Sequence, residues 1–373
     1  MIILGIETSC DETAASVISV ENDKVTLLSN IISSQIALHS TWGGVVPNLA
    51  AREHLKNILP VIGTALEKAR KKPADIDLMA ITAGPGLIPA LLIGTTTAKT
   101  LSYLWRKPLI GIHHIEGHIY ANFIGDKINS ISKNQISLPT GRQAIAKENS
   151  ELNIKFPILA LVVSGGHTQL VLMRAHLHYE IIGETVDDAV GEAFDKVARI
   201  LGLGYPGGPA VEKLADNFFG EKKFKIILPR PMLKSANFNF SFSGLKTAVL
   251  YATKKNPENL KDPNYISEMC HEFQTAITDV LISKTIHAAK KYAPKTILLA
   301  GGVSANKNLR EKLELSVKEN LKNTVCLVPE LGYSMDNATM IAMAGYYRWK
   351  NLKAKKSLEK TWENMETSAS LKL

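Results

Sequence analysis

Short apolar runs alternate with longer amphipathic segments along most of this 373-residue chain. The short runs are typical of buried strands, whereas apolar residues that recur every three or four positions predict helices. The predicted strands are 2–6, 14–18, 108–112, 159–163, 169–173 and 297–300, and the predicted helices are 52–70, 88–104, 187–201, 269–292 and 336–350. Because strands and helices alternate, the pattern predicts an α/β fold.

One strand pattern occurs twice. A buried strand, a turn of small polar residues and a return strand fill residues 3–18, and the same order fills residues 159–173. This repetition predicts two related halves that face each other.

The periodicity fails between residues 125 and 157, where Asn, Ser, Lys and Gln dominate. Such a segment is typical of an exposed connection. We therefore predict an N-terminal half at 1–126, an exposed insertion or linker at 127–155 and a second half at 156–333. The remaining segment, 334–373, is predicted to pack back on the N-terminal half.

Composition and charge narrow the class of protein. The chain is 45% hydrophobic and carries 44 Lys and Arg against 35 Asp and Glu, a net charge of +9, which favours an anionic partner such as nucleic acid or nucleotide. No apolar run reaches transmembrane length and no signal core opens the chain, so we expect a cytoplasmic protein without a membrane partner. Cys10, Cys270 and Cys326 lack metal-site spacing and are expected to be reduced thiols.

A histidine pair is the strongest chemical signal. His114 and His118 follow a predicted strand and lie four residues apart, so on a helix both imidazoles could reach one metal ion. Glu116 falls between them, unlike the general base of the H-E-x-x-H metalloproteases. Asp336, at an apparent helix start, is the best third ligand. A lone pair of histidines is more often structural, and Asp336 could equally be an N-cap.

Glycine-rich turns are the second signal. The backbone amides of residues 164–166 could hold a phosphate or acyl group, although such turns are often only hairpins. Residues 301–302 lead from a strand into a helix that begins near Asn306, a setting that suits a nucleotide. Residues 206–209, Pro-Gly-Gly-Pro, are predicted to form a stiff turn between helices.

Acidic residues cluster in two places. Asp188, Glu192 and Asp195 have helical spacing and form either a solvated face or, through Asp195, a ribose acceptor. Asp11 and Glu12, together with the nearby Glu7, could act as acids or bases, hold a cation or simply cap a turn. Walker A, Gly-x-Ser-x-Gly and protein-kinase motifs are absent from the sequence.

Ordered segments throughout the chain resemble the TsaD/Gcp family, which is related to the Kae and OSGEP proteins and was once labelled O-sialoglycoprotein endopeptidase. The matching segments are 5–13, 43–47, 84–87, 114–118, 163–170, 187–199, 205–209, 240–247, 300–309 and 336–344. Four positions depart from the family pattern: Asn48 replaces a glutamate, Pro89 replaces a glycine, and Ser334-Met335 replaces Cys-Thr before Asp336.

The resemblance implies an actin/Hsp70/sugar-kinase-like (ASKHA) fold, with two ribonuclease-H-like halves and a ligand cleft between them. It implies transfer of a threonylcarbamoyl group from threonylcarbamoyl-AMP to N6 of the adenosine that follows the anticodon, in tRNAs that read ANN codons, with release of AMP. The implied partners besides tRNA are TsaB-like and TsaE-like proteins, and the intermediate comes from a TsaC protein.

The resemblance also assigns residues. By position, His114, His118 and Asp336 match the family's metal ligands, and they would suit one divalent ion, Fe(II) first and Zn second. The implied substrate and nucleotide contacts are Val162, Val163, Ser164, Gly165, Gly166, Asp195, Gly208, Glu212 and Asn306. From the chemistry, Glu12 or Asp11 is the candidate proton acceptor.

Three alternatives remain open at the level of the sequence. They are a metalloprotease, as the old family label states, a small-molecule kinase or ATPase of the same fold class, and a noncatalytic scaffold. The displaced Glu116 argues against the first, and the basic charge balance with a histidine pair argues against the second.

Overall fold

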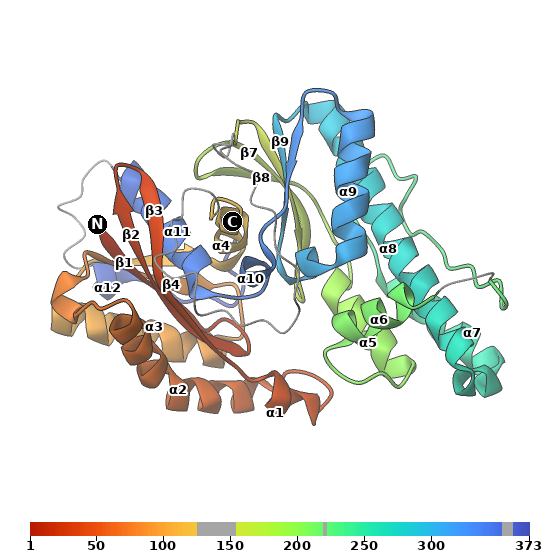
Figure 1. Ribbon diagram of the computed structural model, residues 1–373, viewed down its shortest axis with the longest axis horizontal. Coiled ribbons are helices and arrows are strands. Elements are labelled where there is room, and N and C mark those ends of the chain that lie inside the picture. Colours follow the sequence, from red (N-terminus) through yellow and green to blue (C-terminus); the bar gives the residue numbers. More distant parts are fainter. Residues whose placement is uncertain (125–153, 219–221, 353–360) are drawn as a thin grey trace. The chain divides into compact units, whose positions relative to one another are not determined.

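The computed structural model describes residues 1–124, 154–218, 222–352 and 361–373, which form two compact units (Figure 1). Unit 1 comprises Met1–Gln35, Pro47–Asn153 and Asp336–Leu373, and unit 2 comprises Ile36–Val46 and Ile154–Met335. The short segment Ile36–Val46 thus belongs to unit 2, whereas the predicted boundaries placed it in the N-terminal half. The predicted insertion at 127–155 lies outside the described residues, except for its last two.

Unit 1 is built on one sheet in the order β3-β2-β1-β4-β5. The first three strands are antiparallel, and β4 and β5 continue the sheet parallel to β1. The strands are β1 (Ile2–Glu7), β2 (Glu12–Glu21), β3 (Lys24–Ser34), β4 (Leu78–Gly84) and β5 (Leu109–His113). The helices are α2 (Pro47–Lys68), α3 (Ile88–Trp105), α4 (His114–Ala121), α11 (Ala338–Asn351) and α12 (Thr361–Asn364), with a 3₁₀ turn at Pro73–Asp75.

Helices cover both faces of this sheet because successive side chains of β1 point to opposite sides. Leu4 and Ile6 pack in one apolar cluster with Ile58 of α2. Gly5, between them, faces α11 so closely that a Cβ atom would lie 2.3 Å from the carbonyl oxygen of Ala338. Helix α11, from the C-terminal part of the chain, therefore covers one face of the N-terminal sheet.

Unit 2 repeats the same sheet. Its order, β8-β7-β6-β9-β10, has three antiparallel strands followed by two parallel ones. The strands are β6 (Ile158–Val163), β7 (Thr168–Ala175), β8 (His178–Glu184), β9 (Thr296–Ala300) and β10 (Val325–Leu327). The helices are α1 (Ile36–Ser40), α5 (Val190–Ile200), α6 (Gly207–Asp216), α7 (Ser243–Lys255), α8 (Pro263–Tyr292), α9 (Lys307–Asn320) and α10 (Leu331–Ser334), with 3₁₀ turns at Pro257–Lys261 and Gly302–Ala305. The prediction of two related ribonuclease-H-like sheets is confirmed.

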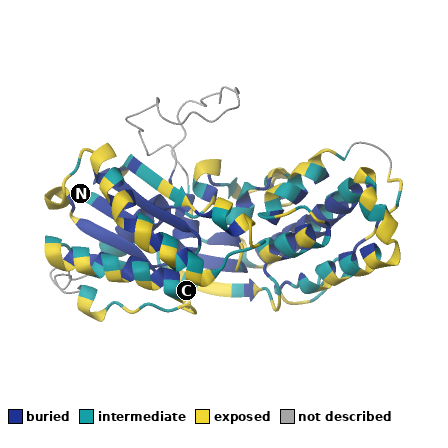
Figure 2. Ribbon diagram, turned by 90° about the horizontal axis from the view of Figure 1, so that it is seen from below, coloured by how far each residue is buried: buried dark blue, intermediate teal, exposed yellow. Residues whose placement is uncertain are grey.

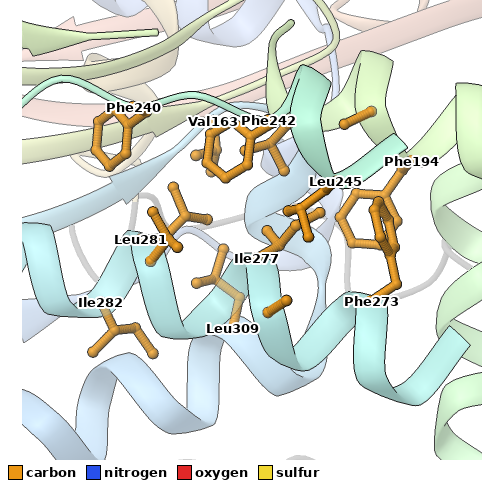
Figure 3. Packing of buried hydrophobic residues seen from close by; sticks show 14 of the residues in the cluster. Val163, Phe194, Phe240, Phe242, Leu245, Phe273, Ile277, Leu281, Ile282 and Leu309 are labelled. Atoms are coloured by element: carbon orange, nitrogen blue, oxygen red, sulfur yellow. The ribbon is translucent and has the colours of Figure 1, made fainter. Parts of the chain in front are cut away.

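The long helix α8 organises the core of unit 2. Its residues Phe273, Ile277 and Leu281 pack toward β6 and α5 (Figure 3). The ring of Phe273 meets that of Phe194 edge to face, with centroids 5.2 Å apart. Full burial of each such side chain contributes about 1.5–3 kcal/mol. Figure 2 shows the buried strands of the sheets in dark blue.

Two local predictions were wrong. The Pro-Gly-Gly-Pro segment is not a turn between helices, because α6 begins at Gly207 and runs through it, with Pro206 as N-cap. Pro209 is tolerated there since amides in the first helical turn have no intrahelical partner. Asp188 does not lie on the same helical face as Asp195, since α5 begins only at Val190. Among the described residues, no helix is long and apolar enough to cross a membrane.

Candidate functional site

The predicted metal ligands come together in unit 1. His114 and His118 lie one turn apart on α4, which starts directly after β5. The Oδ1 atom of Asp336 lies 3.1 Å from Nε2 of His118 and 3.5 Å from Nε2 of His114. Each residue offers one donor atom within 4.8 Å of the other two. The sequence spacing thus corresponds to a real cluster of two imidazoles and one carboxylate.

Asp336 is not a helix cap. The N-cap of α11 is Asn337, whose side chain accepts a hydrogen bond from the backbone N–H of Met340 at 3.0 Å. The cap interpretation of Asp336 is therefore wrong, and its carboxylate faces the two histidines instead.

The donor set suits a cation. Both ring nitrogens of His118 are buried and make no hydrogen bond, a costly arrangement for a polar ring in a protein interior, and Nε2 faces the Asp336 carboxylate at 3.1 Å. An ion between His118 and Asp336 would satisfy Nε2 and offset the carboxylate charge.

His114 is held from behind by a carboxylate. Its Nδ1 atom lies 3.2 Å from both Glu7 Oε2 and Ser9 Oγ, so Nε2 is turned toward Asp336. Burial lowers the pKa of His114, but the charges of Asp336 and Glu7 outweigh this effect and raise it to about 9. A carboxylate behind a histidine is the usual support of a metal ligand. The sequence placed Glu7 among acids or cation holders and missed this role.

Glu116 is committed to an ion pair. It is fully buried, and Arg348 of α11 donates to it from Nε at 2.9 Å and from Nη2 at 2.6 Å. The pair fastens α4 to α11, the helix that follows Asp336. A carboxylate engaged by a guanidinium is not available to activate water, which argues against the peptidase alternative.

The two candidate proton acceptors, Asp11 and Glu12, are both buried at the turn between β1 and β2. Burial and the charges of Asp11 and Asp336 raise the pKa of Glu12 to about 9, although the Ser34 hydroxyl donates to its carboxylate at 3.1 Å. The raised pKa favours the protonated form of Glu12, and this effect comes largely from its burial beside Asp11.

In unit 2, the glycine turn is fixed on one side and open on the other. Residues 162–163 end β6 and are fully buried. The carbonyl of Ser164 accepts a hydrogen bond from Gly191 N–H at 3.1 Å, which joins the turn to α5. Gly165 and Gly166 are open, since a Cβ atom on either would meet nothing within 4 Å. Their backbone can be approached closely by a ligand.

Two predicted acidic contacts also anchor helix starts. Asp195 accepts a hydrogen bond from Gly207 N–H at 2.7 Å. The neighbouring Gly208 is open, since a Cβ atom there would meet nothing within 4 Å. Glu212 accepts one from Lys307 N–H at 2.7 Å, at the start of α9. Burial raises the pKa of Glu212 above its usual value, although Lys307 N–H opposes this. These side chains thus tie α5 to α6 and α6 to α9.

Asn306 is the N-cap of α9, as its place in the sequence predicted. Its Oδ1 atom accepts from Leu309 N–H at 2.9 Å, and its Nδ2 atom donates to Gln274 at 2.8 Å. The preceding loop packs on β6, since a Cβ atom on Gly301 would lie 2.4 Å from the carbonyl oxygen of Val163. Since β6 and β9 are parallel neighbours, the glycine turn and Asn306 lie at the same edge of the sheet.

Comparison with known proteins decides the family. A family model described as TsaD: tRNA N6-adenosine threonylcarbamoyltransferase matches residues 26–133 and 139–343. The chain belongs to the TsaD family.

Curated TsaD relatives match almost the whole chain. The tRNA N6-adenosine threonylcarbamoyltransferase of Persephonella marina is 48% identical over 353 residues, covering 94% of this chain and 91% of that protein. The enzyme of the same name from Thermosipho melanesiensis is 49% identical over 347 residues, covering 93% and 94%.

Among solved structures, HypF of T. kodakarensis aligns with a TM-score of 0.57 at 12% identity, covering 96% of this chain and 48% of HypF. At that identity the likeness shows the fold alone. Together with the repeated sheets, it confirms the ASKHA fold class for this TsaD-family chain.

Proposed function

We propose that this TsaD-family chain transfers a threonylcarbamoyl group from threonylcarbamoyl-AMP to N6 of the adenosine that follows the anticodon, in tRNAs that read codons beginning with A. The observation that carries the proposal is the buried ring of His118, which makes no hydrogen bond and lies beside Asp336 and His114. It accompanies a family match over most of the chain.

His114, His118 and Asp336 would hold one divalent cation, Fe(II) by preference and Zn as the alternative. Two imidazoles and one carboxylate leave coordination positions open for substrate. When bound, such an ion supplies Lewis-acid stabilisation of negative charge on the substrate. Glu7 orients His114, and the Glu116–Arg348 pair keeps α4 against α11.

The other site residues act mainly by positioning the two substrates. The adenosine N6 amine attacks the carbamoyl carbon, the bond from that carbon to the phosphate oxygen breaks, and AMP leaves with the electron pair. Glu12 or Asp11 takes the amine proton. The amides of residues 164–166 hold the phosphate, while Asp195, Gly208, Glu212 and Asn306 hold the nucleoside. Because an exocyclic amine is a weak nucleophile, orientation contributes more than base catalysis.

The proposed tRNA substrate and partner proteins rest on the family resemblance. The net charge of +9 suits a polyanionic substrate. TsaB-like and TsaE-like proteins are the proposed partners, and the cytoplasm is the proposed compartment.

The test is a reconstituted reaction. Purified protein, with and without the partner proteins, is incubated with threonylcarbamoyl-AMP and an unmodified tRNA that reads an A-starting codon, and nucleosides are analysed by mass. We expect modified adenosine with the unaltered protein, loss with His114→Ala, and no loss with His178→Ala, an exposed histidine of unit 2. Absence of product with all partners present would exclude the transferase.

A further inference from the structure

The C-terminal tail, residues 365–371, lies along the carboxyl ends of β4 and β5 within unit 1. The backbone N–H of Ser368 donates to the carbonyl of Ala83 at 3.0 Å. The carbonyl of Ala369 accepts from Gly86 N–H at 3.4 Å. The tail is thus hydrogen-bonded to the strand end and to the turn that leads into α3.

Two glycines of unit 1 leave room for the tail to pack closely. A Cβ atom on Gly84, where φ is +146°, would lie 1.9 Å from the carbonyl oxygen of Ser368. A Cβ atom on Gly111 of β5 would lie 3.2 Å from the side chain of Met365. Met365 also packs against the apolar cluster of unit 1. A larger residue at Gly84 would displace the tail, so the fit of the tail depends on glycine at Gly84 and Gly111.

His113 connects the tail to the metal-ligand helix. Its Nε2 atom lies 2.9 Å from the carbonyl oxygen of Leu371, and its Nδ1 atom accepts from Ile115 N–H at 3.2 Å, which caps α4. A carbonyl only accepts and a backbone amide only donates, so these partners specify the neutral ring with hydrogen on Nε2. One ring therefore holds the tail on one side and the start of α4 on the other.

We infer that the C-terminal tail is a positioning element of the metal centre, and that His113 transmits its position to His114 and His118. The inference rests on the proposed metal site. The tail acts by fixing the first turn of α4 through His113. Outer contacts that orient ligands typically change metal affinity by about 10–100-fold.

The test is cobalt binding, which needs neither tRNA nor partner proteins. Co(II) affinity and its visible spectrum are measured for the full chain, for a chain ending at Asn364, and for His113→Asn, which keeps an acceptor near Nδ1 but cannot reach Leu371. A chain ending at Lys372 is the matched control, because it loses only the last residue and keeps the Leu371 carbonyl as an amide. Circular dichroism and thermal melting report folding.

We expect the chain ending at Asn364 and His113→Asn to lose about 10–100-fold in Co(II) affinity, with altered spectra. The control should match the full chain, and His113→Asn should have little further effect in the shortened chain, since both act through one contact. If the chain ending at Asn364 does not fold, the Co(II) affinity and spectrum of His113→Asn test the inference by themselves. Unchanged affinity and spectrum, even with a lower melting temperature, would overturn the inference while leaving the metal site. No Co(II) binding by the full chain would overturn both.

Discussion

At the scale of single residues, the support behind His114 is the feature with the clearest consequence. Glu7 Oε2 accepts a hydrogen bond from the Thr82 hydroxyl at 2.6 Å and faces the His114 ring. In Glu7→Gln the size is kept but the charge is lost, so we expect metal affinity to fall by about 10–100-fold. A chelator competition titration measures this. Equal affinities for Glu7→Gln and for the exposed control Glu67→Gln would contradict it.

The raised pKa of His114 predicts a pH effect on the metal-free protein. Because the folded pKa is about 9 and the ordinary value is 6.5, the charged ring stabilises the fold fully below about pH 6.5. This stabilisation is lost as the pH rises toward 9. Over the same range protons stop competing for His114, so metal affinity should rise.

Thermal melting with chelator at pH 6.5 and pH 9 measures the first effect, and cation titrations measure the second. In His114→Gln, the part of the pH dependence of stability and of metal affinity that comes from the His114 ring should disappear. A metal affinity that is flat from pH 6.5 to 9 would show that the ring is neutral throughout.

At this scale the sequence was informative where a short spacing carried the signal. His114 and His118 were predicted from a four-residue interval, and the start of α9 from Asn306 as its N-cap. Arg348 could not be predicted as the partner of Glu116, because 232 residues separate them and only the packing of α11 brings them together. For the same reason, Asp336 was ambiguous between ligand and cap.

At the scale of elements, the attachment of α4 to α11 rests on the Glu116–Arg348 pair. Arg348→Met would leave the fully buried carboxylate of Glu116 uncompensated. We expect a loss of about 3 kcal/mol in the free energy of unfolding, at the low end for buried pairs because Arg348 is partly exposed.

Urea unfolding, followed by hydrogen exchange of the α4 amides, measures this loss. The exposed pair of Lys350 with Asp23 provides the control, since Lys350→Met should change stability by under about 1 kcal/mol. The double variant Glu116→Gln/Arg348→Met should regain much of the loss. If Arg348→Met behaved like Lys350→Met, the two helices would be held by apolar packing instead.

Two of the strands that the sequence missed share a physical cause. Strands β3 and β8 carry many half-buried or exposed positions, so their apolar pattern is weaker than that of the buried strands β1 and β6. The start of α6 was missed because two prolines and two glycines are usually typical of turns, and only the first turn of a helix accepts them.

At the scale of the whole molecule, the excess of basic residues predicts that tRNA binding depends on salt. Each phosphate neutralised by Lys or Arg releases counterions, so log affinity should fall linearly with log salt concentration. Binding of labelled tRNA measured between 50 and 200 mM salt tests this, with an uncharged adenosine analogue as control. Equal salt dependence for tRNA and for the control would contradict a phosphate-contacting surface.

The presence of two related halves could be predicted from sequence, because each begins with the same strand, turn and return strand, but the full strand order of the sheets could not. The division into units could not be predicted in full. Residues 36–46 join unit 2 through contacts far along the chain, such as the hydrogen bond from Arg199 to the Gly43 carbonyl. No local sequence pattern in residues 36–46 predicts that this segment contacts Arg199.

The discontinuous make-up of unit 1 has a consequence for synthesis on the ribosome. Unit 2 is complete once residue 335 has been made, whereas unit 1 still lacks α11 at that point. At roughly 5–20 residues per second, the N-terminal sheet waits on the order of ten seconds or longer for the helix that covers its second face. A nascent chain interrupted before Asp336 has both histidines but lacks the third ligand, the Asp336 carboxylate. Prematurely terminated chains would therefore leave the ribosome with an uncovered sheet, as substrates for chaperones and proteases and not as metal-loaded enzyme.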